Sequence, residues 1–176
     1  MNPTVKENME QAIACFRLPT FREIPNVGLY LEQTSKYISE YFNSVGSITL
    51  TPSMISNYVK KKLVSNPVKK QYNREQIASL FFITVAKTVL SIEDIRMLLR
   101  IQEKTYSKEA AYEYFRSELE NMLCFVFGVK SAAETEKPEN DEGKILLHNT
   151  IIAAAHKAYL DNYCAILAAE EDFAEE

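Results

Sequence analysis

Glycine is scarce in this chain, and the short motifs of several enzyme classes are missing from it. The 176 residues include 4 glycines, and none lies in a glycine-rich phosphate loop or a G-x-S-x-G nucleophile motif. The H-E-x-x-H pair of zinc metalloproteases is also missing. We therefore expect no enzymatic activity and no cofactor. Few glycines beside many Leu, Ala, Glu and Lys favour helices over a β-sandwich or barrel.

Cysteine and histidine are equally sparse. The three cysteines, Cys15, Cys124 and Cys164, are too far apart in sequence for a metal-binding pair, and each has apolar neighbours. This predicts reduced, mostly buried thiols, with redox sensing by Cys124 or Cys164 as the alternative. His148 and His156 would lie about 12 Å apart along a helix, so a shared metal is not expected.

No segment of the sequence is typical of a membrane or secreted protein. The longest apolar stretch, residues 77–90, is interrupted by Lys87 and is too short to cross a bilayer. Glu7 and Glu10 lie where a secretory signal would need apolar residues. We predict a cytoplasmic protein without a membrane partner.

The chain does have a basic segment on an acidic background. Net charge is −4, yet residues 60–74 hold five lysines and one arginine. We call these six residues the basic island: Lys60, Lys61, Lys62, Lys69, Lys70 and Arg74. A local cationic cluster favours an anionic partner. The alternative is a solvated helix end, because lysines there complement the helix dipole without any partner.

Hydrophobic spacing and capping residues predict a mostly helical protein. Helices are expected at residues 4–16, 28–43, 52–62, 74–89, 92–100, 107–128 and 144–171. Two prolines predict an extended connection at 17–27, and Pro67 predicts a small hairpin or extended loop at 64–72. The fold class is thus all-α with a small β-hairpin wing, ending in a C-terminal helical hairpin. The expected units are residues 1–47, 48–103 and 104–176, with a mobile loop at about 129–143.

The helix at 52–62 combines a strong start signal with a polar outer face. Thr51 can cap the first turn, and Pro52 has no amide to leave unpaired. Helical spacing turns Met54, Ile55, Tyr58 and Val59 inward. It turns Ser53, Ser56, Asn57, Lys60 and Lys61 outward. Serine and asparagine can hydrogen-bond to bases, and lysine neutralises phosphates.

Residues 48–100 resemble the winged helix-turn-helix head of MerR-type transcription regulators. The matching pieces are Thr51-Pro52, Tyr58, Lys61 with Leu63, Pro67, Lys70 with Tyr72, residues 74–77, and LSIEDI at 90–95. The resemblance implies a recognition helix at 52–62, a wing at 64–72 and duplex DNA as partner. The chain departs from the family pattern at Ser56 and Asn57, at Lys62, where glycine is usual, and at Lys70, where arginine is usual. A left-handed turn at Lys62 would suit glycine better.

Residues of about 15–125 also resemble a family of cytoplasmic proteins from Gram-positive bacteria, described as a domain of unknown function with a MerR-like head. The stretches that carry this resemblance are RLPTFREIPNVGLYLEQ and TPSMISNYVKKKL. The likeness supports the fold more than it defines a biological role.

Our main hypothesis is a DNA-binding transcription regulator, acting as a homodimer because one head buries too little DNA for high affinity. The predicted contacts are Ser53, Ser56, Asn57, Tyr58, Lys60, Lys61, Lys69, Lys70, Tyr72 and Arg74. For the two tyrosines core packing competes with phosphate contact, and for Arg74 a role at the helix start comes first. The alternative is a protein-interaction module that keeps the fold without binding DNA. Aromatic residues of the last third either line an effector pocket or only pack.

Overall fold

The computed structural model describes residues 3–132 and 141–174, most of which are helical. In chain order the elements are α1 (Pro3–Ala14), β1 (Leu29–Tyr30), α2 (Leu31–Phe42), the 3-10 helix η1 (Asn43–Val45), α3 (Pro52–Lys60), β2 (Gln71–Tyr72), α4 (Arg74–Ala86), α5 (Ile92–Thr105), α6 (Lys108–Val126) and α7 (Glu142–Ala174). This confirms a helical fold class with one small β element. Most of the loop expected at 129–143 lies outside the described residues.

Capping residues set the starts of four helices where the sequence predicts them. Each cap accepts a hydrogen bond from a first-turn amide, which would otherwise have no partner within the helix. The pairs are Thr51 with Met54 N, Asn73 with Gln76 N, Ser91 with Asp94 N and Ser107 with Ala110 N. The expected ends are less accurate, since α3 stops at Lys60, α4 at Ala86 and α5 continues to Thr105.

The sheet joins two segments that are far apart in sequence. Leu29 pairs with Tyr72 and Tyr30 with Gln71, in antiparallel register. The expected helix at 28–43 therefore begins as a strand and turns helical only at Leu31. Gly28 permits this approach, because a Cβ there would lie 2.6 Å from the Cβ of Gln71.

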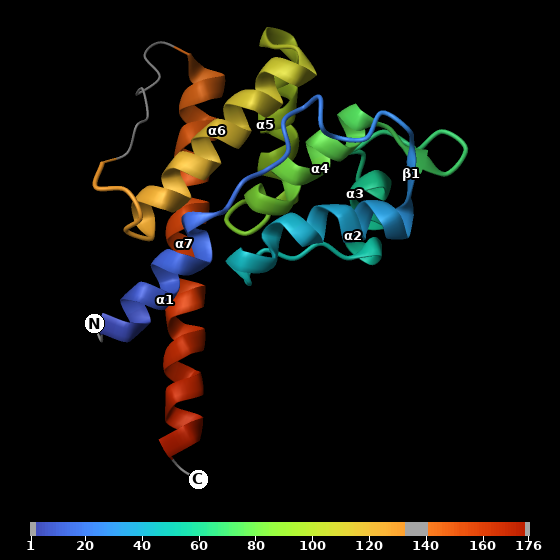
Figure 1. Ribbon diagram of the computed structural model, residues 1–176. Coiled ribbons are helices and arrows are strands. Elements are labelled where there is room, and N and C mark those ends of the chain that lie inside the picture. Colours follow the sequence, from blue (N-terminus) through green and yellow to red (C-terminus); the bar gives the residue numbers. More distant parts are fainter. Residues whose placement is uncertain (1–2, 133–140, 175–176) are drawn as a thin grey trace.

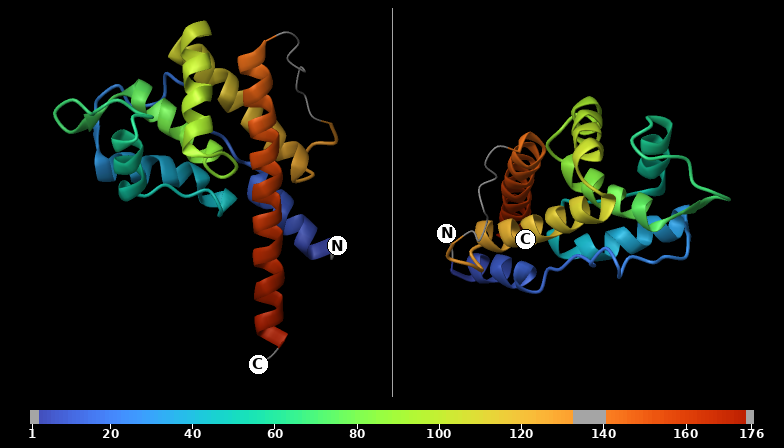
Figure 2. Two further views of the ribbon diagram at one scale, coloured as in Figure 1. Left: turned by 180° about the vertical axis from the view of Figure 1, so that it is seen from behind. Right: turned by 90° about the horizontal axis from the view of Figure 1, so that it is seen from above.

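The helices are arranged around α4, the most buried element. In the right view of Figure 2, α3 and α5 project to one side of α4, whereas α2 and the N-terminal connection lie on the other side. α7 packs mainly on α6 and extends beyond the other helices at its C-terminal end (Figure 1). Phe81 of α4 is fully buried, with aromatic rings of α2 and α6 around it.

The C-terminal helix pair differs from the expected hairpin, because α6 and α7 run in the same direction. The residues in contact follow the same order along both helices: Lys144 lies over Tyr114, His148 contacts Glu118, and Tyr159 packs on Phe127. Short connections give antiparallel neighbours, whereas a parallel pair needs a segment as long as the helix it retraces.

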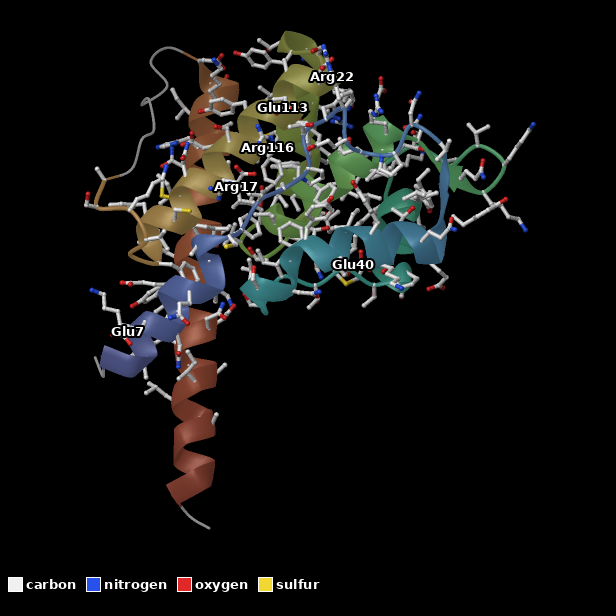
Figure 3. All side chains as sticks on the ribbon, in the orientation of Figure 1. Glu7, Arg17, Arg22, Glu40, Glu113 and Arg116 are labelled. Atoms are coloured by element: carbon white, nitrogen blue, oxygen red, sulfur yellow. The ribbon has the colours of Figure 1, made fainter. Side chains whose placement is uncertain are left out.

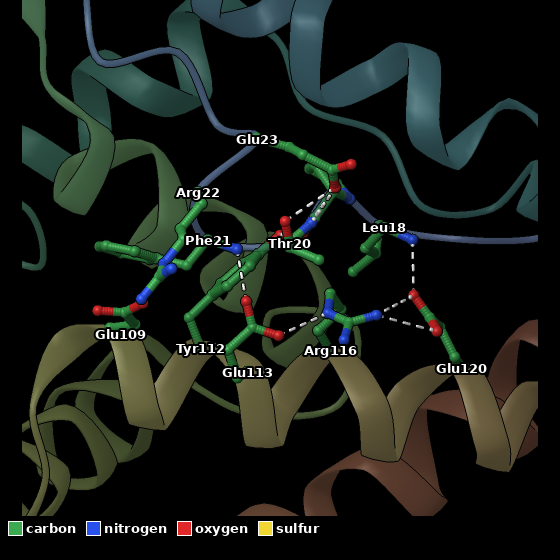
Figure 4. Close-up of polar contacts among 11 residues, drawn as sticks. Leu18, Thr20, Phe21, Arg22, Glu23, Glu109, Tyr112, Glu113, Arg116 and Glu120 are labelled. Atoms are coloured by element: carbon green, nitrogen blue, oxygen red, sulfur yellow. Dashed lines mark hydrogen bonds and ion pairs between the residues drawn. The ribbon is translucent and has the colours of Figure 1, made fainter.

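The N-terminal connection is held on α6 by a ladder of charged side chains. Glu113, Arg116 and Glu120 lie on successive turns, with Arg116 bonded to Glu113 at 2.9 Å and to Glu120 at 3.2 Å (Figure 4). The Glu113 carboxylate also accepts a hydrogen bond from the backbone amide of Phe21, and the Glu120 carboxylate accepts one from that of Leu18. Burial alone would lower the pKa of Arg116, but its bonds and attraction to the two glutamates raise it overall. Figure 3 shows Arg17, Arg22, Glu113 and Arg116 gathered around this connection.

Two of the three cysteine expectations are wrong. Cys124 is buried in α6 as predicted, but Cys15 and Cys164 are exposed. Cys164 is exposed on α7 although its neighbour Tyr163 packs against the core, because successive helical residues point to different sides of the helix. Cys15 directly follows the last residue of α1.

In the described part of the chain, no helix combines the length and apolar character needed to cross a membrane.

Candidate nucleic-acid interface

The outer face of α3 carries the side chains that the sequence assigns to it. Ser53, Ser56, Asn57 and Lys60 are exposed, as is Lys61 just after the helix. The opposite face is anchored by Ile55 and Tyr58, which are fully or almost fully buried. The Ser56 hydroxyl donates to the Pro52 carbonyl oxygen at 3.0 Å and keeps its lone pairs for an outside donor. α3 therefore presents a short polar and basic ridge on a rigid base.

Residues 68–71 form a two-residue hairpin turn with lysines at both central positions. Val68 and Gln71 exchange backbone hydrogen bonds of 3.1 and 2.9 Å. Lys69 and Lys70 both have positive φ, 50° and 64°. Two positive φ values define the type I′ turn, which strongly prefers Asn-Gly. Both lysine side chains are exposed at the tip.

The base of this hairpin is fixed by Gln76, in the first turn of α4. Its side-chain amide donates to the carbonyl oxygens of Ser65 and Asn66, at 2.9 and 3.2 Å. Its carbonyl oxygen accepts the Asn73 amide at 2.9 Å, which completes a reciprocal cap at the start of α4. The segment before Val68 and the segment after Gln71 are thus held by one buried side chain.

Lys62 occupies a left-handed position at the end of α3, with φ of 57°. Lys62 N donates to Val59 O, and Leu63 N donates to Tyr58 O, both at 2.9 Å. This pattern is the Schellman motif, whose left-handed residue is usually glycine. The sequence expectation that this position suits glycine agrees with the observed backbone.

Replacing Lys69 with asparagine and Lys70 with glycine should stabilise the protein. A left-handed residue with a Cβ costs about 1–2 kcal/mol. Glycine removes this cost at position 70, and asparagine tolerates the left-handed conformation better than lysine at position 69. We expect a gain of about 1–2 kcal/mol in the free energy of unfolding, measured by urea denaturation. Lys60→Gln with Lys61→Gln removes the same charge from positions without positive φ. A similar gain in that control would contradict the strain argument.

Three of the predicted contact residues are engaged inside the molecule. Tyr58 and Tyr72 are 1% and 4% exposed. Burial raises the pKa of Tyr58 to about 12 and raises that of Tyr72 as well, so both hydroxyls stay neutral at physiological pH. Arg74 donates to the carbonyl oxygens of Ile24 and Arg22, at 2.8 and 3.0 Å, and lies over the Phe21 ring. These three side chains therefore stabilise the helix-turn-helix region itself. The other seven residues predicted to contact DNA are exposed to solvent.

No carboxylate of the described residues lies within ion-pair distance of a cation of the basic island. Every ion pair among residues 3–132 and 141–174 lies outside the basic island. A further arginine that the sequence reasoning missed, Arg96 of α5, donates to Lys61 O at 2.9 Å. Its position four residues before Arg100 on one helix was the available signal.

Comparison with known protein families gives one result. The family model described as Domain of unknown function (DUF1836) matches residues 19–115, which is more than half of the chain, and the chain belongs to this family. The matched span begins in the N-terminal connection and ends in α6, so it includes the Tyr112 hydroxyl bond to Pro19 O at 2.8 Å. Neither the curated proteins nor the solved structures contain a match.

Proposed function

We propose that this member of the DUF1836 family binds duplex DNA, with α3 as the recognition helix and residues 68–71 as the tip of a wing. One observation carries the proposal. Among the described residues, three non-glycine positions have positive φ, and all three are lysines of the basic island: Lys62, Lys69 and Lys70. Their backbone strain brings no packing contact within the chain, which indicates that these lysines serve a contact with another molecule.

Complementarity to the helix dipole does not account for this pattern. The dipole favours lysine near the end of α3, but its effect falls off within the last turn. Lys69 and Lys70 lie in a turn after Pro67, outside any helix. Glycine or asparagine at these positions would also relieve strain. The retained charges therefore favour an anionic partner.

The exposed face of α3 has the shape and chemistry that this partner requires. The major groove of B-DNA is about 12 Å wide and admits one α-helix. Ser53, Ser56 and Asn57 would face base edges, and Lys60 and Lys61 would meet phosphates. The MerR-like order of helix, turn, helix and wing supports the same placement. We include in the proposal a role as a dimeric transcription regulator, because paired heads bind two half-sites.

A second candidate is a protein-interaction module, and a specific observation favours it. Three large apolar side chains are exposed around the sheet and its turn: Val27 at 74%, Tyr30 at 52% and Val68 at 71%. Leu29–Tyr30 pairs directly with Gln71–Tyr72, so this apolar surface lies beside the hairpin lysines. A partner held there by apolar contact would bind with little dependence on salt.

The two candidates are separated by replacing Lys60, Lys61, Lys69 and Lys70 with alanine. Binding to random genomic DNA fragments is measured by fluorescence anisotropy at several salt concentrations. For the wild type, affinity should fall steeply with salt, with a log–log slope of about −0.9 per phosphate contact. The variant should bind at least about tenfold more weakly at low salt, with a smaller slope.

A control variant removes two positive charges from other elements. Lys6 of α1 and Lys36 of α2 are both exposed and are not part of the basic island, so Lys6→Gln with Lys36→Gln should leave binding almost unchanged. Equal binding by wild type and the alanine variant would refute the phosphate role. A wild type that binds no DNA even at low salt would favour the interaction module.

A further inference from the structure

A second group of cations lies beside the C-terminal end of α3. Lys61 and Lys62 from that end, together with Arg96 and Arg100 of α5, line a groove of about 330 Å³. Leu63 and Leu99, both buried, form its apolar floor. Two elements separated by more than 30 residues thus bring four positive charges to one concave surface.

The single carboxylate of this groove is already paired. Glu103 lies at the groove, and its Oε1 accepts the Lys108 ammonium at 2.6 Å. Arg96 is fixed from the other side, because its Nη2 donates to Lys61 O at 2.9 Å. A guanidinium has five N–H donors, so this bond orients Arg96 and leaves other donors for a ligand. The groove is therefore both preorganised and strongly positive.

The groove and the hairpin turn flank the recognition helix. In both views of Figure 2, α3 lies between the hairpin loop and α5. The exposed polar face of α3 consequently has cations on two sides, Lys69 and Lys70 on one and the groove on the other. A helix in the major groove has a sugar–phosphate backbone along each rim. The wing would contact one of these backbones, which leaves Lys60 and Lys61 as the only phosphate contacts considered so far for the other.

We propose that this groove binds the second phosphate backbone of the same DNA duplex. The inference rests on the proposed function, and it adds Lys62, Arg96 and Arg100 to the contact surface. Arginine suits this task because its planar fork donates two parallel hydrogen bonds to one phosphate. Lys62 would add a point charge from its left-handed position. Arg96 and Arg100 lie one helical turn apart on α5, and so present their charges along one line.

The test uses a variant that should remain folded. Arg100 is exposed, and glycine at position 62 suits the left-handed backbone, so Arg100→Gln with Lys62→Gly removes two charges without loss of stability. Binding to short random-sequence duplexes is measured across a series of salt concentrations. We expect the salt slope to decrease by about 0.9 for each cation removed, and affinity at low salt to fall about tenfold. The variant Lys6→Gln with Lys36→Gln has the same change in net charge and should bind as wild type does.

Each outcome decides between the groove and the wider proposal. If the groove variant binds as the control does, while the hairpin variant Lys69→Asn with Lys70→Gly is weakened, the groove inference is wrong and DNA binding stands. If wild type shows no salt-dependent binding, the proposed function and this inference both fail. Inorganic tripolyphosphate supplies a second arm. A small-anion site would show itself by a rise in the melting temperature of wild type, but not of the groove variant, when tripolyphosphate is added. If the groove substitutions also leave duplex binding unchanged, the inference that the groove binds DNA is overturned.

Discussion

Replacing Phe81 with alanine is expected to lower the free energy of unfolding by about 3–5 kcal/mol. Phe81 is fully buried, and its ring lies within 6.1 Å, between ring centroids, of four others: Tyr37, Tyr41, Phe42 and Tyr112. The loss combines the transfer energy of the ring with the cavity left between α2, α4 and α6. Since whole domains are stable by about 5–15 kcal/mol, this loss would remove a large fraction of the total stability.

Urea denaturation followed by circular dichroism measures this effect. Phe125 provides a matched control within the same fold, because it is a phenylalanine of α6 with 38% of its surface exposed. Phe125→Ala should cost about 1 kcal/mol or less. Similar costs at both positions would mean that the aromatic cluster around Phe81 does not form the centre of the core.

Replacing His148 with leucine should cost a similar amount, about 3–5 kcal/mol, for an electrostatic reason. His148 Nδ1 lies 2.6 Å from Glu118 Oε1, between the parallel helices α6 and α7. Both residues are buried, at 9% and 6% exposure. Leucine fills much of the same volume but leaves the Glu118 carboxylate buried without this partner. An uncompensated buried charge is far more costly than an apolar replacement of both partners.

The double variant Glu118→Met with His148→Leu makes this argument testable. It should recover most of the stability lost in the single histidine variant, because no orphaned carboxylate remains. His156→Leu is the control, since His156 is exposed on the same helix eight residues later. All variants are compared by their free energies of unfolding in urea. A double variant less stable than His148→Leu alone would show that the pair is net stabilising and that burial of the carboxylate is not the source of the loss.

Local chemistry made much of the fold predictable. Thr51, Asn73, Ser91 and Ser107 each cap a helix through their own side chain, so a few neighbouring residues specify the start. The outer face of α3 was predictable for the same reason, because helical spacing separates Asn57 from Ile55. Helix ends are less well specified: α4 stops at Ala86 and not at Val89, because the amides of Thr88 and Val89 donate to Val85 O and Ala86 O in tighter turns that apolar spacing does not distinguish from an α-helix.

Long-range pairing could not be predicted in the same way. Leu29 continues a helical pattern in sequence, yet its backbone pairs with Tyr72 in the sheet. Arg74 was assigned to the helix start and to phosphate, but its acceptors are carbonyl oxygens about 50 residues earlier. Likewise, Glu118 and His148 carry no sequence signal for each other. Their contact follows from the parallel packing of α6 and α7, which the pattern of apolar residues does not specify.

The antiparallel pairing of β1 with β2 determines how this protein can be divided. A fragment cut before residue 48 would lose the strand that holds the hairpin, together with the Ile24 and Arg22 carbonyl groups that anchor Arg74. It would also lose Ser35 and Ser39, whose hydroxyls donate to Leu50 O just ahead of α3. Excision of the helix-turn-helix by itself should thus give a chain that cannot assemble its own wing, and a shortened version for crystallography or NMR should start no later than the segment leading into Leu18.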